Sequence, residues 1–498
     1  MPATFTLGQV LNGVKLRSDL APEWAARGVA GLAYDSRRVE RDFVFFAFSG
    51  SRADGRGFAQ DAVSRGACAV VSESAAPVDF PAPWVVVEHG RQALAGAARN
   101  FYGRPDERVH FTGITGTNGK TTTAYLLDAI LREAGRAGGF VTGMMGTIEY
   151  RMTGESRKAV NTTPESLDIM EFADELARKG GTHLTMEVSS HALALARVWG
   201  FHFHTAVFTN LSQDHLDFHT TMEEYAAAKR KLFVPDHAPA PDWSVLNADD
   251  PASMEMLPSG GQVLWYGVAP SAGLRAEKIE HGLGGLRFEA VHAGVRQNVE
   301  SSLAGKVNVS NILAAMGAGL SYGLDLETMA RGVSACTAVP GRFERIDCGQ
   351  PFLVAVDFAH TGDALRNVIQ MARELTSGRV ITVFGCGGDR DRSKRPLMGM
   401  AAAELSDLVV LTSDNPRSED PLAIMNDVMV GLGRFDTRYI TEPDRAKAIR
   451  VAFEEAKAGD VVLLAGKGHE TQQILKDKTI DFDDRETARR ILRSLGYE

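Results

Sequence analysis

Short apolar runs alternate along this chain with longer stretches in which apolar residues recur at helical spacing. Val109, Phe111 and Ile114 predict a short buried strand, and apolar positions three or four residues apart then continue from Leu126 until Gly135. Further strand-like runs occur at residues 184–186, 206–211 and 352–356. Because strands alternate with helical patterns, we expect α/β layers with parallel sheets in the middle and last segments.

Two breaks in this alternation divide the chain. It has 498 residues, and a single hydrophobic core stops growing at about 250–300 residues, so about three domains are expected. Gly-Arg-Pro-Asp at 103–106 interrupts the pattern, and Val-Pro-Gly-Arg at 339–342 precedes a new alternation of strands and helices. The predicted domains are residues 1–105, 106–338 and 339–498.

Composition and charge restrict the class of protein. No apolar run approaches the roughly 18 residues that a membrane span requires, and the first residues lack a basic region followed by an apolar stretch, so we expect a cytoplasmic protein. The net charge of −9 argues against a nucleic-acid partner and allows a small anionic ligand held by local basic groups. The cysteines form no CxxC pair, which suits a reducing compartment and gives no structural zinc site. We expect them to be small buried hydrophobic residues: Cys68, Cys336, Cys348 and Cys386.

Glycines, a lysine and hydroxyl residues fill the turn after the strand predicted at 109–114. From Gly113 to Thr122 the sequence reads Gly-Ile-Thr-Gly-Thr-Asn-Gly-Lys-Thr-Thr. Glycines let backbone N–H groups turn towards an anion, the following helix N-terminus adds positive partial charge, and Lys120 adds a full charge. The usual P-loop pattern is missed by one position, because Ile114 stands where its first glycine is expected. The run predicts a variant phosphate cradle, and a glycine-rich turn without a ligand is the alternative.

Acidic and imidazole side chains follow two of the predicted strands. Glu187 comes directly after the apolar run 184–186, at the strand end where α/β sheets bind ligands. Because Mg2+ prefers oxygen ligands, Glu187 is the first metal candidate. After the run 206–211, Asp-His-Leu-Asp-Phe-His at 214–219 admits two interpretations, a metal or acid/base site and a polar surface loop.

Ordered motifs along nearly the whole chain closely resemble those of the ATP-dependent Mur ligase family. They are Gly-Thr-Asn-Gly-Lys-Thr at 116–121, Asn-Thr-Thr-Pro at 161–164, Glu-Val-Ser-Ser-His at 187–191, Asp-His-Leu-Asp-Phe-His at 214–219, Ala-Ala-Ala-Lys at 226–229, Asn-Val-Ser-Asn at 308–311, Pro-Gly-Arg-Phe-Glu at 340–344, Asp-Phe-Ala-His at 357–360, Gly-Cys-Gly-Gly-Asp-Arg at 385–390 and Gly-Lys-Gly-His-Glu at 466–470. The resemblance implies three domains. These are an N-terminal α/β domain that binds the UDP end of a nucleotide-sugar precursor, a central P-loop-type ATPase with a mainly parallel sheet, and a C-terminal Rossmann-like domain that presents the incoming amino acid.

The reaction implied by the resemblance is amide formation. The terminal carboxylate of the precursor attacks the γ-phosphate of ATP, and an amine then attacks the resulting acyl phosphate. Such a reaction needs positioning and charge neutralisation, which Lys120 and Mg2+ supply. The resemblance assigns catalysis to Lys120, Glu187, His215 and Lys229, metal binding to Thr121, Glu187, His215 and Lys229, and ATP binding to Gly116, Thr117, Asn118, Gly119, Lys120, Thr121, Thr122, Asn308, Arg342 and Asp357.

Lys229 owes its candidate role entirely to the resemblance. On its own, the segment 225–232 is typical of an exposed basic helix. In the family this lysine position is N-carbamylated, because CO2 adds to the neutral amine and gives an anionic oxygen ligand for Mg2+. The ordinary lysine pKa of about 10.4 would have to fall in such a site.

The run Asp-Asn-Pro-Arg at 414–417 resembles the motif of the family members that add meso-diaminopimelate to UDP-N-acetylmuramoyl-alanyl-glutamate. Diaminopimelate carries a distal carboxylate that lysine lacks, and the planar guanidinium of Arg417 suits it. The same guanidinium would repel the side-chain ammonium of lysine. The positions that match amino-acid-binding residues are Arg390, Asp414, Asn415, Pro416, Arg417, Gly466 and Glu470.

Other matches concern the UDP precursor. Loops in the first domain resemble those that grip uridine and diphosphate, and central residues match positions at the muramoyl-peptide end. The residues are Ser36, Ser51, Arg52, Ala53, Asn161, Thr162, Thr163, Ser189 and Arg197. The sequence departs from the family pattern at Leu195, where relatives often have glutamine, and at Gly362, which replaces a usual proline.

The resemblance therefore implies a cytoplasmic, monomeric ligase of peptidoglycan precursor synthesis that adds meso-diaminopimelate. Its partners are ATP, Mg2+, UDP-N-acetylmuramoyl-dipeptide and meso-diaminopimelate. The alternatives are a lysine-adding ligase of the same family, a ligase similar to folylpolyglutamate synthetase, and a P-loop nucleotide-binding module without ligase activity.

Overall fold

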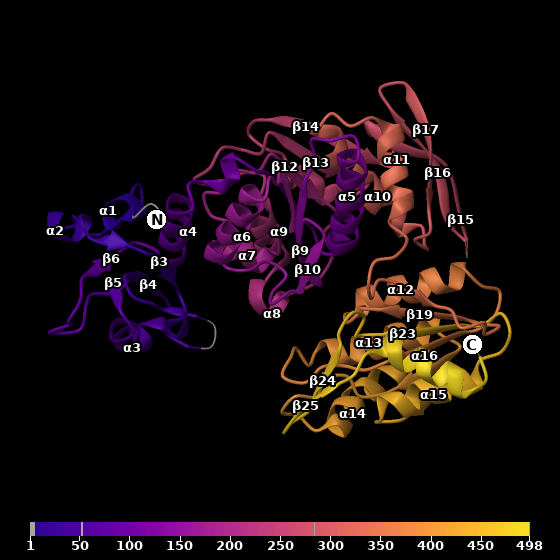
Figure 1. The fold of residues 1–498 in the computed structure, drawn as a ribbon. Coiled ribbons are helices and arrows are strands. Elements are labelled where there is room, and N and C mark those ends of the chain that lie inside the picture. Colours follow the sequence, from indigo (N-terminus) through magenta and orange to yellow (C-terminus); the bar gives the residue numbers. More distant parts are fainter. Residues whose placement is uncertain (1–4, 51–52, 283, 498) are drawn as a thin grey trace.

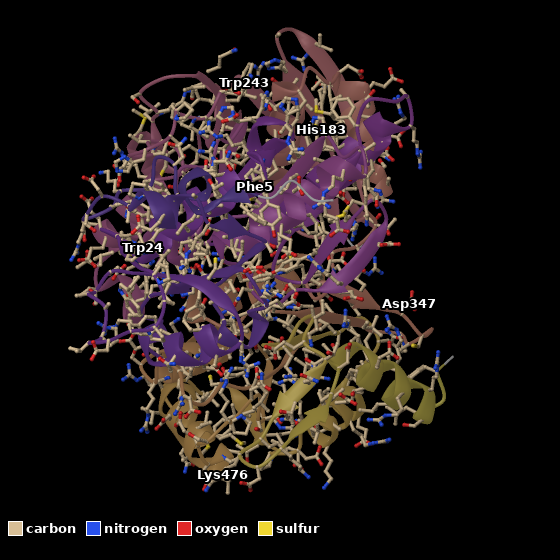
Figure 2. The ribbon with its side chains drawn as sticks, turned by 60° about the vertical axis from the view of Figure 1, so that its left-hand side comes forward. Phe5, Trp24, His183, Trp243, Asp347 and Lys476 are labelled. Carbon is tan, nitrogen blue, oxygen red and sulfur yellow. The ribbon has the colours of Figure 1, made fainter. Side chains whose placement is uncertain are left out.

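The computed structural model describes residues 5–50, 53–282 and 284–497. Its strands form sheets of four, eleven and six strands, together with two short pairs. Figure 1 shows these sheets as three bodies in chain order, from indigo through magenta to orange and yellow. Figure 2 shows Trp243 and His183 in the central body and Lys476 at the far end of the C-terminal body.

The N-terminal body is built on a parallel sheet in the order β3-β4-β5-β6. Its central strand β4 is buried on both faces, because Phe45 and Phe46 belong to different apolar clusters. The elements are β1 (Phe5–Thr6), α1 (Leu7–Val10), α2 (Pro22–Ala25), β2 (Gly28–Val29), β3 (Gly31–Ala33), β4 (Phe43–Ala47), α3 (Ala59–Ser64), β5 (Ala67–Ser72), β6 (Trp84–Val86) and α4 (Gly90–Phe101). The short 3-10 helices in the chain are η1 (Ser36–Arg38), η2 (Gly55–Phe58), η3 (Pro105–Glu107) and η4 (Pro251–Met256).

The central sheet has the order β10-β9-β8-β11-β7-β12-β13-β14-β15-β16-β17. Strands β8 to β15 in this order run parallel, and antiparallel hairpins extend both edges. The strands are β7 (His110–Thr115), β8 (Thr142–Met145), β9 (Glu149–Met152), β10 (Glu155–Lys158), β11 (His183–Glu187), β12 (Thr205–Phe208), β13 (Trp243–Asn247), β14 (Gln262–Gly267), β15 (Leu274–Gly282), β16 (Gly285–His292) and β17 (Val295–Ser301). The predicted mainly parallel central sheet is confirmed.

Helices cover both faces of the central sheet. Alternate residues of a strand serve opposite layers, because Val207 packs with one apolar cluster and Phe208 with the other. The helices are α5 (Lys120–Gly135), α6 (Ser166–Arg178), α7 (Ser190–Ala194), α8 (Leu216–His219), α9 (Met222–Arg230), α10 (Val307–Ser321) and α11 (Leu326–Ala335).

The C-terminal body contains a sheet in the order β18-β19-β23-β20-β21-β22, in which only β18 runs antiparallel to its neighbour. Its strands are β18 (Glu344–Ile346), β19 (Leu353–Asp357), β20 (Val380–Phe384), β21 (Leu408–Leu411), β22 (Arg438–Thr441) and β23 (Val461–Ala465), and a hairpin adds β24 (Gln472–Ile474) and β25 (Thr479–Asp481). The helices are α12 (Gly362–Glu374), α13 (Lys394–Leu405), α14 (Pro421–Leu432), α15 (Arg445–Glu455) and α16 (Asp484–Ser494).

The breaks expected near residues 105 and 339 fall between the sheets, because α4 ends before β7 begins and α11 ends before β18 begins. The exact domain limits stay a prediction. Among the described residues, no helix combines the length and the apolar character needed to cross a membrane. Cys336, Cys348 and Cys386 are buried as expected, whereas Cys68 is partly exposed.

Candidate active site

The predicted phosphate loop lies between the end of β7 and the start of α5. An added Cβ would lie 1.9 Å from Thr209 Oγ1 at Gly116 and 2.3 Å from Asn311 Oδ1 at Gly119, so neither position has space for a side chain. Gly119 also has a φ of 88°, which favours glycine. The neighbouring strand holds the loop, because Thr209 Oγ1 donates to the carbonyl of Asn118 at 2.6 Å. The loop is therefore shaped by its surroundings before any ligand binds.

Lys120 folds back over this loop from the first turn of α5. Its Nζ donates to the carbonyl oxygens of Gly116 and Thr117, each at 2.8 Å. Burial lowers the pKa of Lys120, and the nearby carboxylates of Glu187 and Asp214 oppose that shift. The amine lies at the loop whose backbone is predicted to bind phosphate.

Lys229 approaches the same loop from α9. Its side chain is buried, with 1 % of the residue exposed, so the interpretation of 225–232 in isolation as an exposed helix is wrong at this residue. Lys229 Nζ donates to the carbonyl of Gly116 at 2.8 Å and lies 4.3 Å from the centre of the Tyr225 ring. Burial, and then the charge of Lys120, lower the pKa of Lys229 well below its ordinary value. The fold thus favours a neutral amine at this position.

Glu187 stands at the end of β11, where the sequence places it. Its Oε2 accepts hydrogen bonds at 3.0 Å from Thr121 Oγ1 and from Thr147 Oγ1, and its Oε1 accepts one at 2.8 Å from the Thr147 backbone. Arg342 of the C-terminal body donates to Thr121 Oγ1 at 3.1 Å. The structure therefore brings Thr121, Glu187 and Arg342 together, and Thr147 is a partner that the motifs did not reveal.

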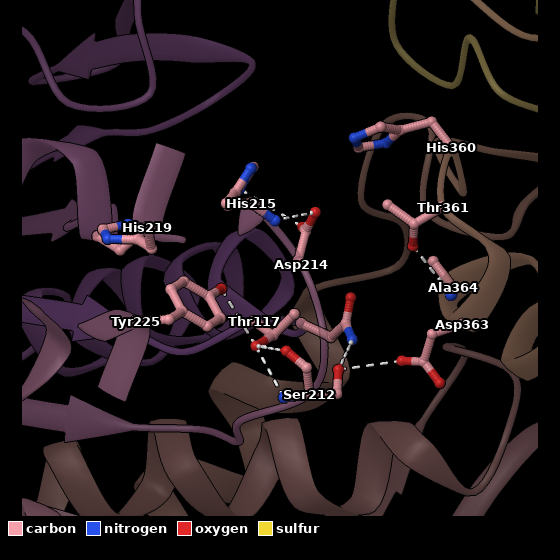
Figure 3. A network of polar contacts seen from close by, with 12 residues as sticks. Thr117, Ser212, Asp214, His215, His219, Tyr225, His360, Thr361, Asp363 and Ala364 are labelled. Atoms are coloured by element: carbon pink, nitrogen blue, oxygen red, sulfur yellow. Dashed lines mark hydrogen bonds and ion pairs between the residues drawn. The ribbon is translucent and has the colours of Figure 1, made fainter. Parts of the chain in front are cut away.

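His215 caps the short helix α8 with a φ of 54°. Its Nε2 lies 3.4 Å from Asp214 Oδ2, and Lys394 of the C-terminal body donates to Asp214 Oδ1 at 3.0 Å. Burial lowers the pKa of His215 to about 4, against the opposing charge of Asp214, so the imidazole is neutral near pH 7. Figure 3 shows His215 and Asp214 facing the gap across which His360 and Thr361 lie.

The oxygen donors beside the phosphate loop form part of a possible magnesium site. Within the described ranges, no group of three or more His, Cys, Asp or Glu side chains is placed to hold a metal. Mg2+ retains several waters and binds through one or two carboxylates together with substrate phosphates. Glu187 and the Thr121 hydroxyl, which are hydrogen-bonded beside the phosphate loop, fit such a partial set.

The remaining candidate ATP residues lie around the junction with the C-terminal body. Asp357 is half-buried and uses both carboxylate oxygens, because Oδ2 accepts from the Phe343 backbone at 2.7 Å and Oδ1 from the Ala359 backbone at 2.8 Å. Burial raises the pKa of Asp357, and the charge of Arg342 opposes this. Asn308 Oδ1 accepts from Asn311, the residue packed against Gly119, at 2.8 Å. Thr117 and Asn118 complete the loop, and Thr122 is buried in the first turn of α5.

The central residues expected at the UDP precursor form one cluster beside Glu187. Thr163 Oγ1 donates to the Glu187 carbonyl at 2.8 Å and accepts from the Ser189 backbone at 3.0 Å. Arg197 donates to the Thr163 carbonyl at 2.8 Å and to Glu165 at 3.1 Å. Thr162 Oγ1 and Thr147 Oγ1 lie 3.1 Å apart, and the Asn161 carbonyl accepts from Tyr150 at 2.5 Å.

The N-terminal candidates lie apart from this cluster. Ser36 begins η1 and is buried, and the Ala53 carbonyl accepts from the Gly50 backbone at 2.8 Å. Ser51 and Arg52 lie outside the described residues. Tyr34, next to the Ser36 loop, donates to Asp168 at 2.5 Å and so joins the N-terminal body to the central one.

The amino-acid candidates gather at the carboxyl ends of β20, β21 and β23. Arg417 has a φ of 51° and donates to the Gly388 carbonyl at 2.7 Å. Burial, and then the charge of Arg390, lower the pKa of Arg417. A Cβ at Gly466 would lie 2.7 Å from Asp414 Oδ2, and Asn415 donates to Glu470 at 2.8 Å. Pro416 lies between Asn415 and Arg417 in the same loop.

A strand, a shaped glycine loop and a helix that starts with lysine define an α/β nucleotide-binding protein. Three family descriptions match the chain: "Mur ligase family, catalytic domain" at residues 28–102, "Mur ligase middle domain" at 114–319 and "Mur ligase, glutamate ligase domain" at 341–468. A relative from Solibacter usitatus, named UDP-N-acetylmuramoyl-L-alanyl-D-glutamate--2,6-diaminopimelate ligase, is 62 % identical and covers 99 % of both chains. The chain belongs to the Mur ligase family, whose members are ATP-dependent ligases.

Solved structures agree with this assignment. A structure with the same ligase name is 32 % identical, covers 100 % of both chains and has a TM-score of 0.70. MurF ligase from Thermotoga maritima, solved in complex with ADP, is 20 % identical, covers 93 % of this chain and 96 % of its own, and has a TM-score of 0.60. At this identity the second likeness shows the fold alone.

Proposed function

We propose that this protein uses ATP to add meso-2,6-diaminopimelate to UDP-N-acetylmuramoyl-L-alanyl-D-glutamate, a step of peptidoglycan precursor synthesis. The observation that carries the proposal is the placement of Lys120 and Lys229 on the Gly116 carbonyl of the phosphate loop. This geometry occurs in a chain that shares 62 % identity with a relative named for that reaction. The Arg417 loop supports the choice of amino acid.

In the proposed reaction, an oxygen of the terminal glutamate carboxylate attacks the γ-phosphorus of ATP, and ADP leaves. The amine of diaminopimelate then attacks the acyl carbon, inorganic phosphate leaves, and the amine loses a proton to give the amide. The glutamate carboxylate and the ATP phosphates are all negative. The protein must therefore position these groups and neutralise their charge. Lys120 and Arg342 supply positive charge beside Thr121, and the loop backbone cradles the phosphates.

Mg2+ would be held by Thr121 and Glu187 at one position and by His215 and a carbamylated Lys229 at a second. When bound, the ion neutralises phosphate charge. Lys229 suits carbamylation because a neutral amine adds to CO2 with loss of one proton, and burial lowers the pKa of this amine. The neutral His215 imidazole can use a nitrogen lone pair as a ligand.

The proposed residues divide by substrate. ATP would be bound by residues 116–122 together with Asn308, Arg342 and Asp357. The UDP precursor belongs to Ser36, Ser51, Arg52, Ala53, Asn161, Thr162, Thr163, Ser189 and Arg197. Diaminopimelate belongs to Arg390, Asp414, Asn415, Pro416, Arg417, Gly466 and Glu470. Domain 1–105 would bind the UDP end of the precursor, domain 106–338 would bind ATP and the muramoyl-peptide end, and domain 339–498 would bind the amino acid. We propose a cytoplasmic monomer that does not bind nucleic acid.

One assay tests the proposal. The protein is incubated with ATP, Mg2+ and UDP-N-acetylmuramoyl-L-alanyl-D-glutamate, together with either meso-diaminopimelate or L-lysine, and phosphate release is measured. We expect release that depends on the precursor and on diaminopimelate. ATP turnover that needs no amino acid would indicate a nucleotide-binding module without ligase activity, and preferential use of lysine would overturn the substrate assignment.

A further inference from the structure

Lys467 is a buried cation in the turn after β23, and none of the roles above uses it. Its side chain is 0 % exposed. Its Nζ lies within hydrogen-bonding distance of Asn415 Oδ1 at 3.2 Å, Glu470 Oε2 at 3.0 Å and the Gln472 carbonyl at 2.8 Å. An ammonium group has three donors, so these acceptors satisfy it completely. A buried charge requires such partners, and here two of them are amino-acid candidates.

Lys467 is one of three groups that fix which way the Asn415 amide points. Asn415 Oδ1 accepts from Lys467 Nζ and from the Ile474 backbone at 3.0 Å, while Nδ2 donates to Glu470 Oε2 at 2.8 Å. Rotating the amide by half a turn would place its NH2 group against two donors and its oxygen against a carboxylate. Only one orientation therefore satisfies all of these groups.

Lys467 also orients the Glu470 carboxylate. Both of its bonds, from Lys467 and Asn415, end on Oε2. Oε1 accepts no hydrogen bond from the described part of the chain and stays available to an ammonium group. Burial alone would raise the pKa of Glu470, but the charge and hydrogen bond of Lys467, together with the hydrogen bond from Asn415 and the charge of His469, hold that pKa below its usual value. The carboxylate is thus ionised and aligned.

The same lysine joins the Asp414–Arg417 loop to the β24–β25 hairpin, which Figure 1 shows beside this end of the sheet. Lys467 Nζ lies 3.7 Å from Asp414 Oδ1. The hairpin side chain Gln473 donates to the Asp414 carbonyl at 2.6 Å, and the Arg417 backbone donates to the Ile474 carbonyl at 3.1 Å. Lys467 therefore adds a positive charge to a junction between the loop that carries Arg417 and the hairpin.

We propose that Lys467 is a positioning residue for the incoming amino acid. It holds Asn415 and Glu470 in the single arrangement that leaves Glu470 Oε1 free to accept the substrate ammonium group. The proposal rests on the proposed function, because it assumes that Glu470 binds the amino acid.

The first test separates the three substrates. Lys467→Met retains the length of the side chain and removes its charge. We expect the KM for diaminopimelate to rise about 10- to 100-fold, because an orienting charged contact is lost, while the KM values for ATP and the UDP precursor change less than about twofold. Lys467→Gln, which keeps a donor, is measured in parallel in case the methionine variant does not fold, and we expect a smaller selective rise.

A matched control removes another cation from the same sheet. Arg379 lies just before β20, at the opposite end from the site, and pairs with Asp460 at 2.8 Å. Arg379→Met is expected to lower the melting temperature and leave all three KM values unchanged. If the Lys467 variants raise the three KM values equally, or none of them, the positioning role is wrong.

A second readout does not depend on activity. A crystal structure of Lys467→Met is expected to show Asn415 or Glu470 in an orientation different from the wild type. Unmoved side chains would overturn the inference even if activity falls. Wild-type protein that uses no diaminopimelate would refute the proposed function, whereas the crystallographic comparison would still decide whether Lys467 orients these residues.

Discussion

Lys120 and Lys229 donate hydrogen bonds to the same backbone carbonyl oxygen, that of Gly116, each at 2.8 Å. One lysine starts the helix after the phosphate loop, and the other lies in the last turn of a helix more than 90 residues later in the chain. Two ammonium groups this close repel each other, so the charge of Lys120 adds to burial in lowering the pKa of Lys229. Burial also lowers the pKa of Lys120, but the carboxylates of Glu187 and Asp214 oppose that shift. Lys120 is therefore the better suited of the two to carry charge, and Lys229 the better suited to react as a neutral amine.

Lys120→Ala tests the first task. The variant should fold, because the loop is also held by Thr209 and Asn210. We expect turnover to fall about 100-fold or more, as it does when a preorganised charge-stabilising group is removed. Phosphate release is measured at saturating substrates, and circular dichroism checks the fold. Near-normal release by a folded variant would contradict the assignment.

Lys229→Ala tests the second task. We expect a loss of about 100-fold or more, because the variant lacks the carbamate charge proposed for Lys229, and we expect added acetate to restore part of the activity by supplying a carboxylate. Lys231→Ala is the matched control, since Lys231 follows the same helix but is exposed. Intact-mass analysis that finds only an unmodified amine in fully active protein, supported by its electron density, would exclude the carbamate.

Arg417→Ala tests the choice of amino acid. A distal carboxylate left without its charged partner should cost on the order of 2–5 kcal/mol in kcat/KM for diaminopimelate. Use of lysine should stay poor or rise slightly, because a repulsive guanidinium is removed, and the KM for ATP should hardly change. Arg417→Lys should recover only part of the loss, since an ammonium lacks the planar fork. An equal loss for both amino acids would show that Arg417 supports the fold or the common end of the substrate.

The sequence alone was sufficient for local features with a repeating pattern. Apolar alternation located β7 and the helix after it, and the position of Glu187 after an apolar run correctly placed its carboxylate at a strand end. These features depend on neighbours within a few residues. The same reasoning predicted that segment 225–232 is an exposed helix. This prediction failed at Lys229, because its burial results from packing against a loop far away in sequence.

Contacts between distant segments explain what local patterns missed. Thr147 binds the Glu187 carboxylate from the turn after β8, and nothing in the local sequence around Thr147 marks it. Lys467 lies in the Gly-Lys-Gly-His-Glu motif at 466–470, but its contacts with the Asp414–Arg417 loop and the β24–β25 hairpin appear only in the folded chain. Side-chain roles of this kind depend on tertiary packing, which residue spacing does not encode.

The last prediction concerns stability at acid pH and depends on His183, far from the proposed chemistry. His183 is buried at the start of β11, where its ring lies 4.6 Å from the rings of Phe140 and Tyr322 and 5.2 Å from that of His110. Burial, followed by the charges of His110 and His204, lowers the pKa of His183 to about 3. The folded state therefore keeps this imidazole neutral.

An unfolded chain binds a proton at His183 below about pH 6.5, whereas the folded chain does so only near pH 3. The unfolded state holds more protons between these values, so stability from this group is complete above pH 6.5 and falls as the pH decreases, by up to about 1.4 kcal/mol per unit. Phenylalanine suits the aromatic surroundings and does not titrate. The melting temperature of His183→Phe should therefore fall less than that of the wild type when the pH is lowered from 7.5 to 5. The exposed His281→Phe is the control and should follow the wild type. Parallel curves for His183→Phe and wild type would show that His183 does not stay neutral in the folded protein.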